Sequence, residues 1–159
     1  MKILFKSFSL KKIIAHLSQL SLVLLCLVVV GVNLFFTILF QYLLFPDSSS
    51  NNFDASLILF LSITFIIPFV ETLFFQSFLI GYITKKFIEY ELIACLISSL
   101  LFAIAHFYSP AYFLKTFISG FCYSLLYIIA SRKISYPFVP VMIAHSIFNL
   151  IGFLIQYLL

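Results

Sequence analysis

Residues 57–83, LILFLSITFIIPFVETLFFQSFLIGYI, form a nearly continuous apolar run in which Glu71 is the only charged side chain. A helix needs about 20 apolar residues to cross the hydrocarbon core of a bilayer, so this run predicts a transmembrane helix. A carboxylate at that depth costs at least about 2.5 kcal/mol on insertion scales and normally faces the protein interior with a partner. We therefore expect Glu71 to point into a helix bundle, towards other polar groups.

The composition of the whole chain agrees with that reading. Of its 159 residues, 64 % are hydrophobic and 9 % are charged, against about 25 % charged in a soluble domain. A bilayer accommodates so much apolar surface only around helices or closed barrels. The sequence predicts an all-α, polytopic membrane protein of about five transmembrane helices, with lipid as its first partner and residues 1–159 as one domain.

Five spans are expected, at about 17–45, 57–83, 92–108, 111–130 and 137–159. Residues 1–16 are interpreted as a basic cytoplasmic tail, and the polar stretch Pro46–Asn52 as a linker. Pro68 lacks the N–H that would bond to the Thr64 carbonyl, so we expect a kink in the second span.

The basic residues favour one orientation. With the N-terminus in the cytoplasm, only Lys115 falls outside, which satisfies the positive-inside rule. The other eight of the nine basic residues lie on the cytoplasmic side: Lys2, Lys6, Lys11, Lys12, Lys85, Lys86, Arg132 and Lys133. This pattern predicts a multi-pass protein of the cell membrane. The net charge of +4 lies in short clusters between apolar runs, which argues against a nucleic-acid partner.

Three further polar side chains lie within predicted spans. His106 is in the third span, and His145 and Asn149 are in the fifth, four residues apart and so on one helix face. At a rise of about 1.5 Å per residue, Glu71 and these three groups lie about 12–21 Å from the inner ends of their helices. Polar groups from three helices at one depth predict a buried cluster.

This set of side chains suits hydrolysis. A carboxylate beside an imidazole can activate water, and a second imidazole with an amide can stabilise the oxyanion of a tetrahedral intermediate. Glu71, His106 and His145 could alternatively hold a catalytic zinc with one open position. There is no HExxH motif, which weakens the ordinary zinc-protease reading. The sequence leaves open whether the cofactor is zinc or none.

Three short motifs carry a family resemblance: Glu71-Thr72-Leu73-Phe74-Phe75-Gln76, then Phe102-Ala103-Ile104-Ala105-His106, then His145-Ser146-Ile147-Phe148-Asn149. In this order the chain resembles the CAAX-processing and bacteriocin-processing (CPBP, or Abi) intramembrane endopeptidases, marked by EExxxR, FxxxH and HxxxN or HxxxD. The resemblance covers about residues 57–155, the expected catalytic core.

The resemblance implies a role for each matching residue. Glu71 matches the water-activating base, and His106 the residue that assists it. His145 and Asn149 match the pair that binds the oxyanion. Both a metal-dependent and a metal-independent glutamate mechanism are implied by the family, and the second is favoured here.

The chain departs from the first motif at two positions. Thr72 replaces the second Glu and Gln76 replaces the Arg. Since an i, i+4 pair can interact on a helix, we interpret Thr72 and Gln76 as a neutral, hydrogen-bonded replacement for an ion pair. Together with Phe102, they are expected to support the site.

These observations predict an intramembrane endopeptidase that cuts a membrane-associated or small precursor peptide. One alternative is a catalytically inactive immunity or scaffold protein of the same fold, which the Thr72 and Gln76 departures favour slightly. Another is a small proton-coupled transporter, although no internal repeat supports it.

Overall fold

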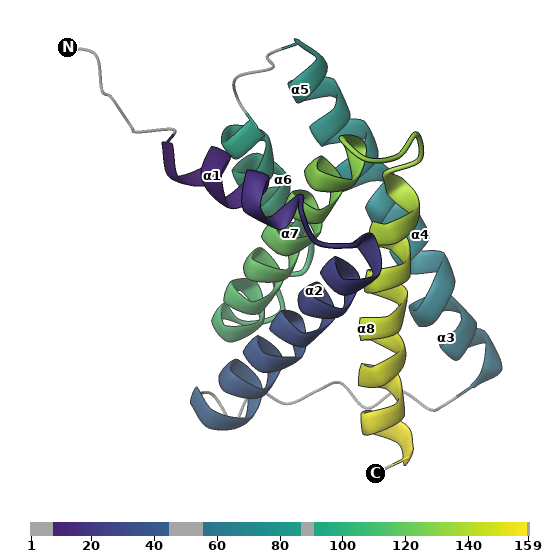
Figure 1. Ribbon diagram of the computed structural model, residues 1–159. Coiled ribbons are helices and arrows are strands. Elements are labelled where there is room, and N and C mark those ends of the chain that lie inside the picture. Colours follow the sequence, from purple (N-terminus) through teal and green to yellow (C-terminus); the bar gives the residue numbers. More distant parts are fainter. Residues whose placement is uncertain (1–7, 45–55, 87–90, 159) are drawn as a thin grey trace.

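The computed structural model describes residues 8–44, 56–86 and 91–158, and every regular element in these ranges is a helix (Figure 1). The elements in chain order are α1 (Phe8–Leu17), α2 (Leu22–Thr37), η1 (Ile38–Leu44), α3 (Leu57–Leu61), η2 (Ser62–Ile66), α4 (Ile67–Glu71), η3 (Thr72–Ile80), α5 (Gly81–Lys86), α6 (Glu91–Ala105), α7 (Pro110–Ser131) and α8 (Phe138–Leu158). The η segments are π-helical. The prediction of an all-α bundle is confirmed; the predicted linker Pro46–Asn52 lies outside the described residues.

Among the described residues, four helical rods are long and apolar enough to cross a membrane: Leu22–Phe40, Leu57–Lys85, Pro110–Ser131 and Phe138–Gln156. The helix Glu91–Ala105 is apolar but shorter. The five expected spans therefore correspond to four long helices and one short one, as in a multi-pass membrane protein. Many large apolar side chains on these helices are exposed, as lipid-facing residues would be.

The α1 helix was not anticipated, since its residues were interpreted as part of a polar tail. It is amphipathic: Ile14 is fully buried, whereas Lys12 and His16 are exposed. Its buried face joins the hydrophobic core cluster of the bundle. Packing of that face against the core is what makes so short a helix stable.

Polar contacts tie the helices together at the end of the bundle where α6 and α8 begin. Arg132, just after α7, pairs with both carboxylate oxygens of Glu91 at 2.5 and 2.7 Å. The neighbouring Lys133 donates to the carbonyl of Leu20, before α2. Basic residues thus mark this end, as the predicted cytoplasmic side requires, although the orientation itself stays a prediction.

The helices α6 and α7 pack closely beside Phe102, and this contact fixes how the two helices are aligned along their axes. A Cβ built at Gly120 would lie 3.1 Å from the Cα of Ser99 and 3.2 Å from Phe102 side-chain atoms. Ser98 extends the contact, donating to the carbonyl of Phe75 at 2.8 Å and accepting from Ser124 at 3.2 Å. These serine hydroxyls connect α7, α6 and η3, the three segments that surround Phe102.

Candidate active site

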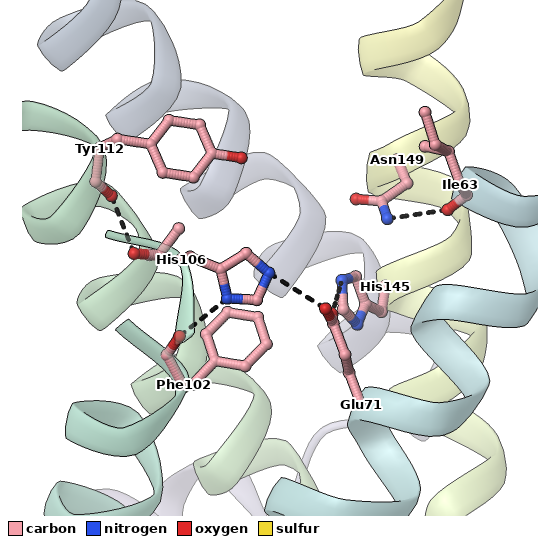
Figure 2. Close-up of polar contacts among 8 residues, drawn as sticks. Ile63, Glu71, Phe102, His106, Tyr112, His145 and Asn149 are labelled. Atoms are coloured by element: carbon pink, nitrogen blue, oxygen red, sulfur yellow. Dashed lines mark hydrogen bonds and ion pairs between the residues drawn. The ribbon is translucent and has the colours of Figure 1, made fainter. Parts of the chain in front are cut away.

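Glu71 is the last residue of α4, at the middle of the Leu57–Lys86 rod. Its side chain is only 17 % exposed. Figure 2 shows its carboxylate between two imidazole rings, one following α6 and one on α8. The three ionisable residues predicted from the sequence therefore meet in one place.

His106 follows α6 directly and contacts Glu71 through Nε2, which lies 3.0 Å from Oε1. The other ring nitrogen, Nδ1, lies 2.8 Å from the carbonyl oxygen of Phe102. A carbonyl oxygen can only accept, so this bond requires a proton on Nδ1. A hydrogen bond between Nε2 and the Glu71 carboxylate then needs one further proton, shared between the imidazole and the carboxyl group.

His145 approaches the opposite side of the carboxylate. Its Nε2 lies 3.6 Å from Oε2 of Glu71, and its side chain is 5 % exposed. The ring stacks on Tyr123 of α7, with centroids 4.6 Å apart and planes inclined by 26°. Stacking of this kind restricts rotation of the imidazole, so Tyr123 holds His145 in its orientation towards Glu71.

Asn149 lies one helical turn beyond His145 on α8, as predicted, but its amide is engaged elsewhere. The Nδ2 atom donates to the carbonyl oxygen of Ile63 at 3.0 Å (Figure 2). In the π-helical η2 segment, the Ile67 N–H donates to Ser62. The next i, i+5 partner would be Pro68, which has no N–H. Asn149 thus supplies the donor that Pro68 cannot give to Ile63.

At Pro68, where we expected a kink, the structure shows a change of hydrogen-bond register. The proline lies at the start of α4, immediately after the π-helical turn of η2. The chain accommodates the missing N–H by a change of hydrogen-bond register. The register change and the Asn149 bond together connect α8 to the rod that carries Glu71.

Phe102 contacts both imidazoles. The centroid of its ring lies 4.5 Å from that of the His106 ring and 6.0 Å from that of the His145 ring. Its carbonyl oxygen is bonded to Nδ1 of His106. The edge of the ring also meets Phe75 at 5.3 Å. Because of the FxxxH spacing, both the ring and the backbone carbonyl of Phe102 contact His106.

The hydrogen bond expected between Thr72 and Gln76 is not formed. Both residues are buried, and Thr72 Oγ1 and Gln76 Nε2 have no hydrogen-bond partner among the residues described. Both residues lie in the π-helical segment η3. Their supporting role therefore stays a prediction.

The arrangement of donors does not fit a metal ion as it stands. Within the described ranges, no group of three or more His, Cys, Asp or Glu side chains is placed to hold one. The Nε2 atoms of His106 and His145 point at separate oxygens of the Glu71 carboxylate. The metal alternative, with Glu71, His106 and His145 as ligands, stays a prediction that chelation tests.

Comparison with known families decides the relationship. Residues 53–151 match the family described as type II CAAX prenyl endopeptidase Rce1-like. The chain belongs to this family. Rce1-like membership, which corresponds to the resemblance found in the three motifs, implies an endopeptidase that acts on a protein substrate in a lipid setting. No curated protein and no solved structure matches the chain.

Two residues near the site of this Rce1-like chain were missed. Tyr123 is buried in the middle of α7, although tyrosine in a membrane protein ordinarily lies at the interfaces. That unusual depth is a sequence signal that could have identified it. Ile63 could not have been found, because it contributes only a backbone carbonyl.

Proposed function

We propose that this protein is an intramembrane endopeptidase in which Glu71 activates a water molecule for attack on a peptide bond. The observation that carries the proposal is the convergence of His106 and His145 on the Glu71 carboxylate, deep in an apolar bundle. Placing these three groups in a poorly solvated interior is costly, and such clusters mark functional sites.

The proton between Glu71 and His106 suggests how the reaction proceeds. Glu71 accepts a proton as the water oxygen attacks the carbonyl carbon of the substrate. His106, held by the Phe102 carbonyl, then delivers a proton to the leaving amine. The water adds to the carbonyl, the C–N bond breaks, and the products are a carboxylic acid and an amine.

The tetrahedral intermediate needs donors for its oxyanion. We propose that His145 donates to it through Nε2; this proposal is supported by the distance of 3.6 Å between Nε2 and Oε2 of Glu71. Asn149 has a second amide N–H beyond the one bound to Ile63, and we propose that this N–H assists. Thr72, Gln76 and Phe102 are proposed as supporting residues that surround the site.

The substrate proposed is a membrane-associated peptide or a small precursor protein. The family description is that of a CAAX prenyl endopeptidase. A CAAX prenyl protein would be one kind of membrane-associated substrate. The exposed face of the rod beside Glu71 carries a shallow, open apolar hollow, lined by Val70, Leu73, Phe74, Ser77 and Phe78. Glu71 itself is not part of this lining. We propose that the apolar part of such a substrate lies along this face.

A second function, an inactive scaffold of the same fold, is favoured by one observation. Thr72 and Gln76 stand where the motif has Glu and Arg, and Thr72 Oγ1 and Gln76 Nε2 are buried without a hydrogen-bond partner among the described residues. The two functions are separated by cleavage of a quenched peptide library in nanodiscs, with wild type beside Glu71→Gln. The proposed function requires that the wild type cleaves a peptide and that Glu71→Gln does not. A folded wild type that cleaves no peptide would favour the scaffold.

A further inference from the structure

Lys115, on the second turn of α7, is a buried cation that the proposed mechanism does not use. The residue is 7 % exposed. In the part of the chain that the structure describes, its ammonium group makes no hydrogen bond or ion pair, and its contact is with the face of the Tyr112 ring, 4.0 Å from the centroid. A cation–π contact offsets only part of the cost of burying a charge.

The acidic residues of the described ranges are engaged elsewhere. Glu91 pairs with Arg132 at one end of the bundle, and Glu71 pairs with the two imidazoles. The hydroxyl of the adjacent residue Thr116 donates to the carbonyls of Tyr112 and Phe113. Lys115 therefore has no anionic partner among the residues that the structure describes.

Helix geometry places Lys115 at the level of the active site. Gly120 of α7 packs on Ser99 of α6, and the two helices run antiparallel. His106 lies seven residues beyond Ser99 and Lys115 lies five residues before Gly120, so both are displaced towards the same end. At about 1.5 Å per residue the displacements are about 10 Å and about 8 Å, which leaves the two residues nearly level.

Electrostatic contacts agree with this placement. His106 lies within electrostatic range of the Lys115 ammonium group, and Tyr112 lies within electrostatic range of Glu71. In Figure 2 the Tyr112 side chain projects from α7 on the same side of the site as His106.

We propose that Lys115 binds a carboxylate of the peptide substrate and so selects substrates that carry a negative charge close to the scissile bond. This inference rests on the proposed function. A lysine is a compact cation with rotatable donors, which suits a carboxylate approaching from a flexible peptide. The carboxylate can come from the C-terminus of the peptide or from an acidic side chain.

The test measures peptide binding separately from cleavage. The chain has no tryptophan, so the emission of a single-tryptophan peptide reports on the peptide alone. Three apolar octapeptides are compared: a free C-terminal acid, its C-terminal amide, and an amide that ends in Glu. They are titrated onto the Glu71→Gln protein in phosphatidylcholine nanodiscs, with empty nanodiscs as the background, and repeated with added Lys115→Gln or Lys115→Arg.

We expect at least one carboxylate peptide to bind about tenfold more tightly than the neutral amide. This preference should disappear with Lys115→Gln and persist with Lys115→Arg. The peptide that shows it identifies the source of the carboxylate. Equal binding of all three peptides, or a preference that survives Lys115→Gln in a variant with normal thermal stability, would overturn the inference and indicate a lysine that merely extends towards the interface.

Wild-type protein incubated with the same peptides separates the two proposals. If the Lys115-dependent preference is present but no peptide is cleaved, carboxylate binding stands and the proposed catalysis fails. If peptides are cleaved without any preference in binding, catalysis stands and the role of Lys115 is wrong.

Discussion

His106 Nε2 lies 3.0 Å from Oε1 of Glu71, and this contact joins a residue at the end of α6 to one in the middle of another membrane-spanning rod. Because the Phe102 carbonyl occupies the other ring nitrogen, the imidazole has a defined tautomer and a defined direction. A carboxylate and an imidazole that share one proton can exchange it during a reaction without solvent, which is scarce at this depth.

The first prediction concerns that proton. In protein with ¹⁵N-labelled histidine, Nδ1 of His106 should be protonated near neutral pH, because the Phe102 carbonyl accepts a hydrogen bond from it. Nitrogen chemical shifts from solid-state or solution NMR measure this directly, with a His106→Gln sample assigning the signal. An Nδ1 atom without a proton would contradict the arrangement of the pair.

The second prediction tests the link between Asn149 and Pro68. Asn149→Ala should lower the free energy of unfolding by about 0.5–1.5 kcal/mol, since it leaves the Ile63 carbonyl without a donor. With Pro68→Ala, residue 68 regains an N–H, so Asn149→Ala should then cost less. Thermal or denaturant unfolding of the four proteins in one detergent gives the coupling energy.

The control in that cycle is the pair of single variants measured under identical conditions. Costs that simply add, with no coupling between the two positions, would show that Asn149 does not compensate for the proline.

The third prediction concerns the packing that sets the level of His106. Gly120→Ala should destabilise the protein by about 1–3 kcal/mol, because its Cβ would lie 3.1 Å from the backbone of Ser99 and 3.2 Å from Phe102. Gly152→Ala is the matched control: nothing lies within 4 Å of its Cβ, and alanine should stabilise the helix by up to about 1 kcal/mol. Equal effects of the two substitutions would refute this account of the α6–α7 contact.

The fourth prediction concerns Tyr123, which stacks on His145. Tyr123→Phe keeps the ring and should retain most activity, whereas Tyr123→Leu removes the stack and should lower kcat/KM by about 2- to 10-fold, the equivalent of an aromatic pair. Peptide cleavage measured beside thermal stability distinguishes positioning from general damage. A leucine variant as active as wild type would show that the stack does not orient His145.

The fold was largely predictable because a bilayer imposes simple constraints. Apolar runs of sufficient length gave the spans, and the cost of ionisable groups in lipid identified Glu71, His106 and His145 as one cluster. The structure brings all three together. The α1 helix was missed because its stability comes from burying Ile14 in the bundle, a tertiary effect that a basic, polar stretch does not reveal.

Details of hydrogen bonding were beyond the sequence for a different reason. The backbone changes from α-helical to π-helical register at η2 and again at η3, a change that residue spacing does not predict. The same change of register determines which carbonyl Pro68 leaves without a donor, and therefore where Asn149 bonds. Residue spacing predicts which side chains share a face, but the backbone register decides which atoms meet.

The measurement that tests the central claim most directly is kcat/KM for the best library peptide, with wild type beside Glu71→Gln, each with and without a metal chelator. The glutamate mechanism predicts that the variant, folded and equally stable, loses about 10²- to 10⁴-fold, and that chelation leaves the wild type unchanged. Loss of wild-type activity on chelation, restored by zinc, would contradict the metal-independent mechanism. Undiminished cleavage by Glu71→Gln would contradict the catalytic role of Glu71 itself.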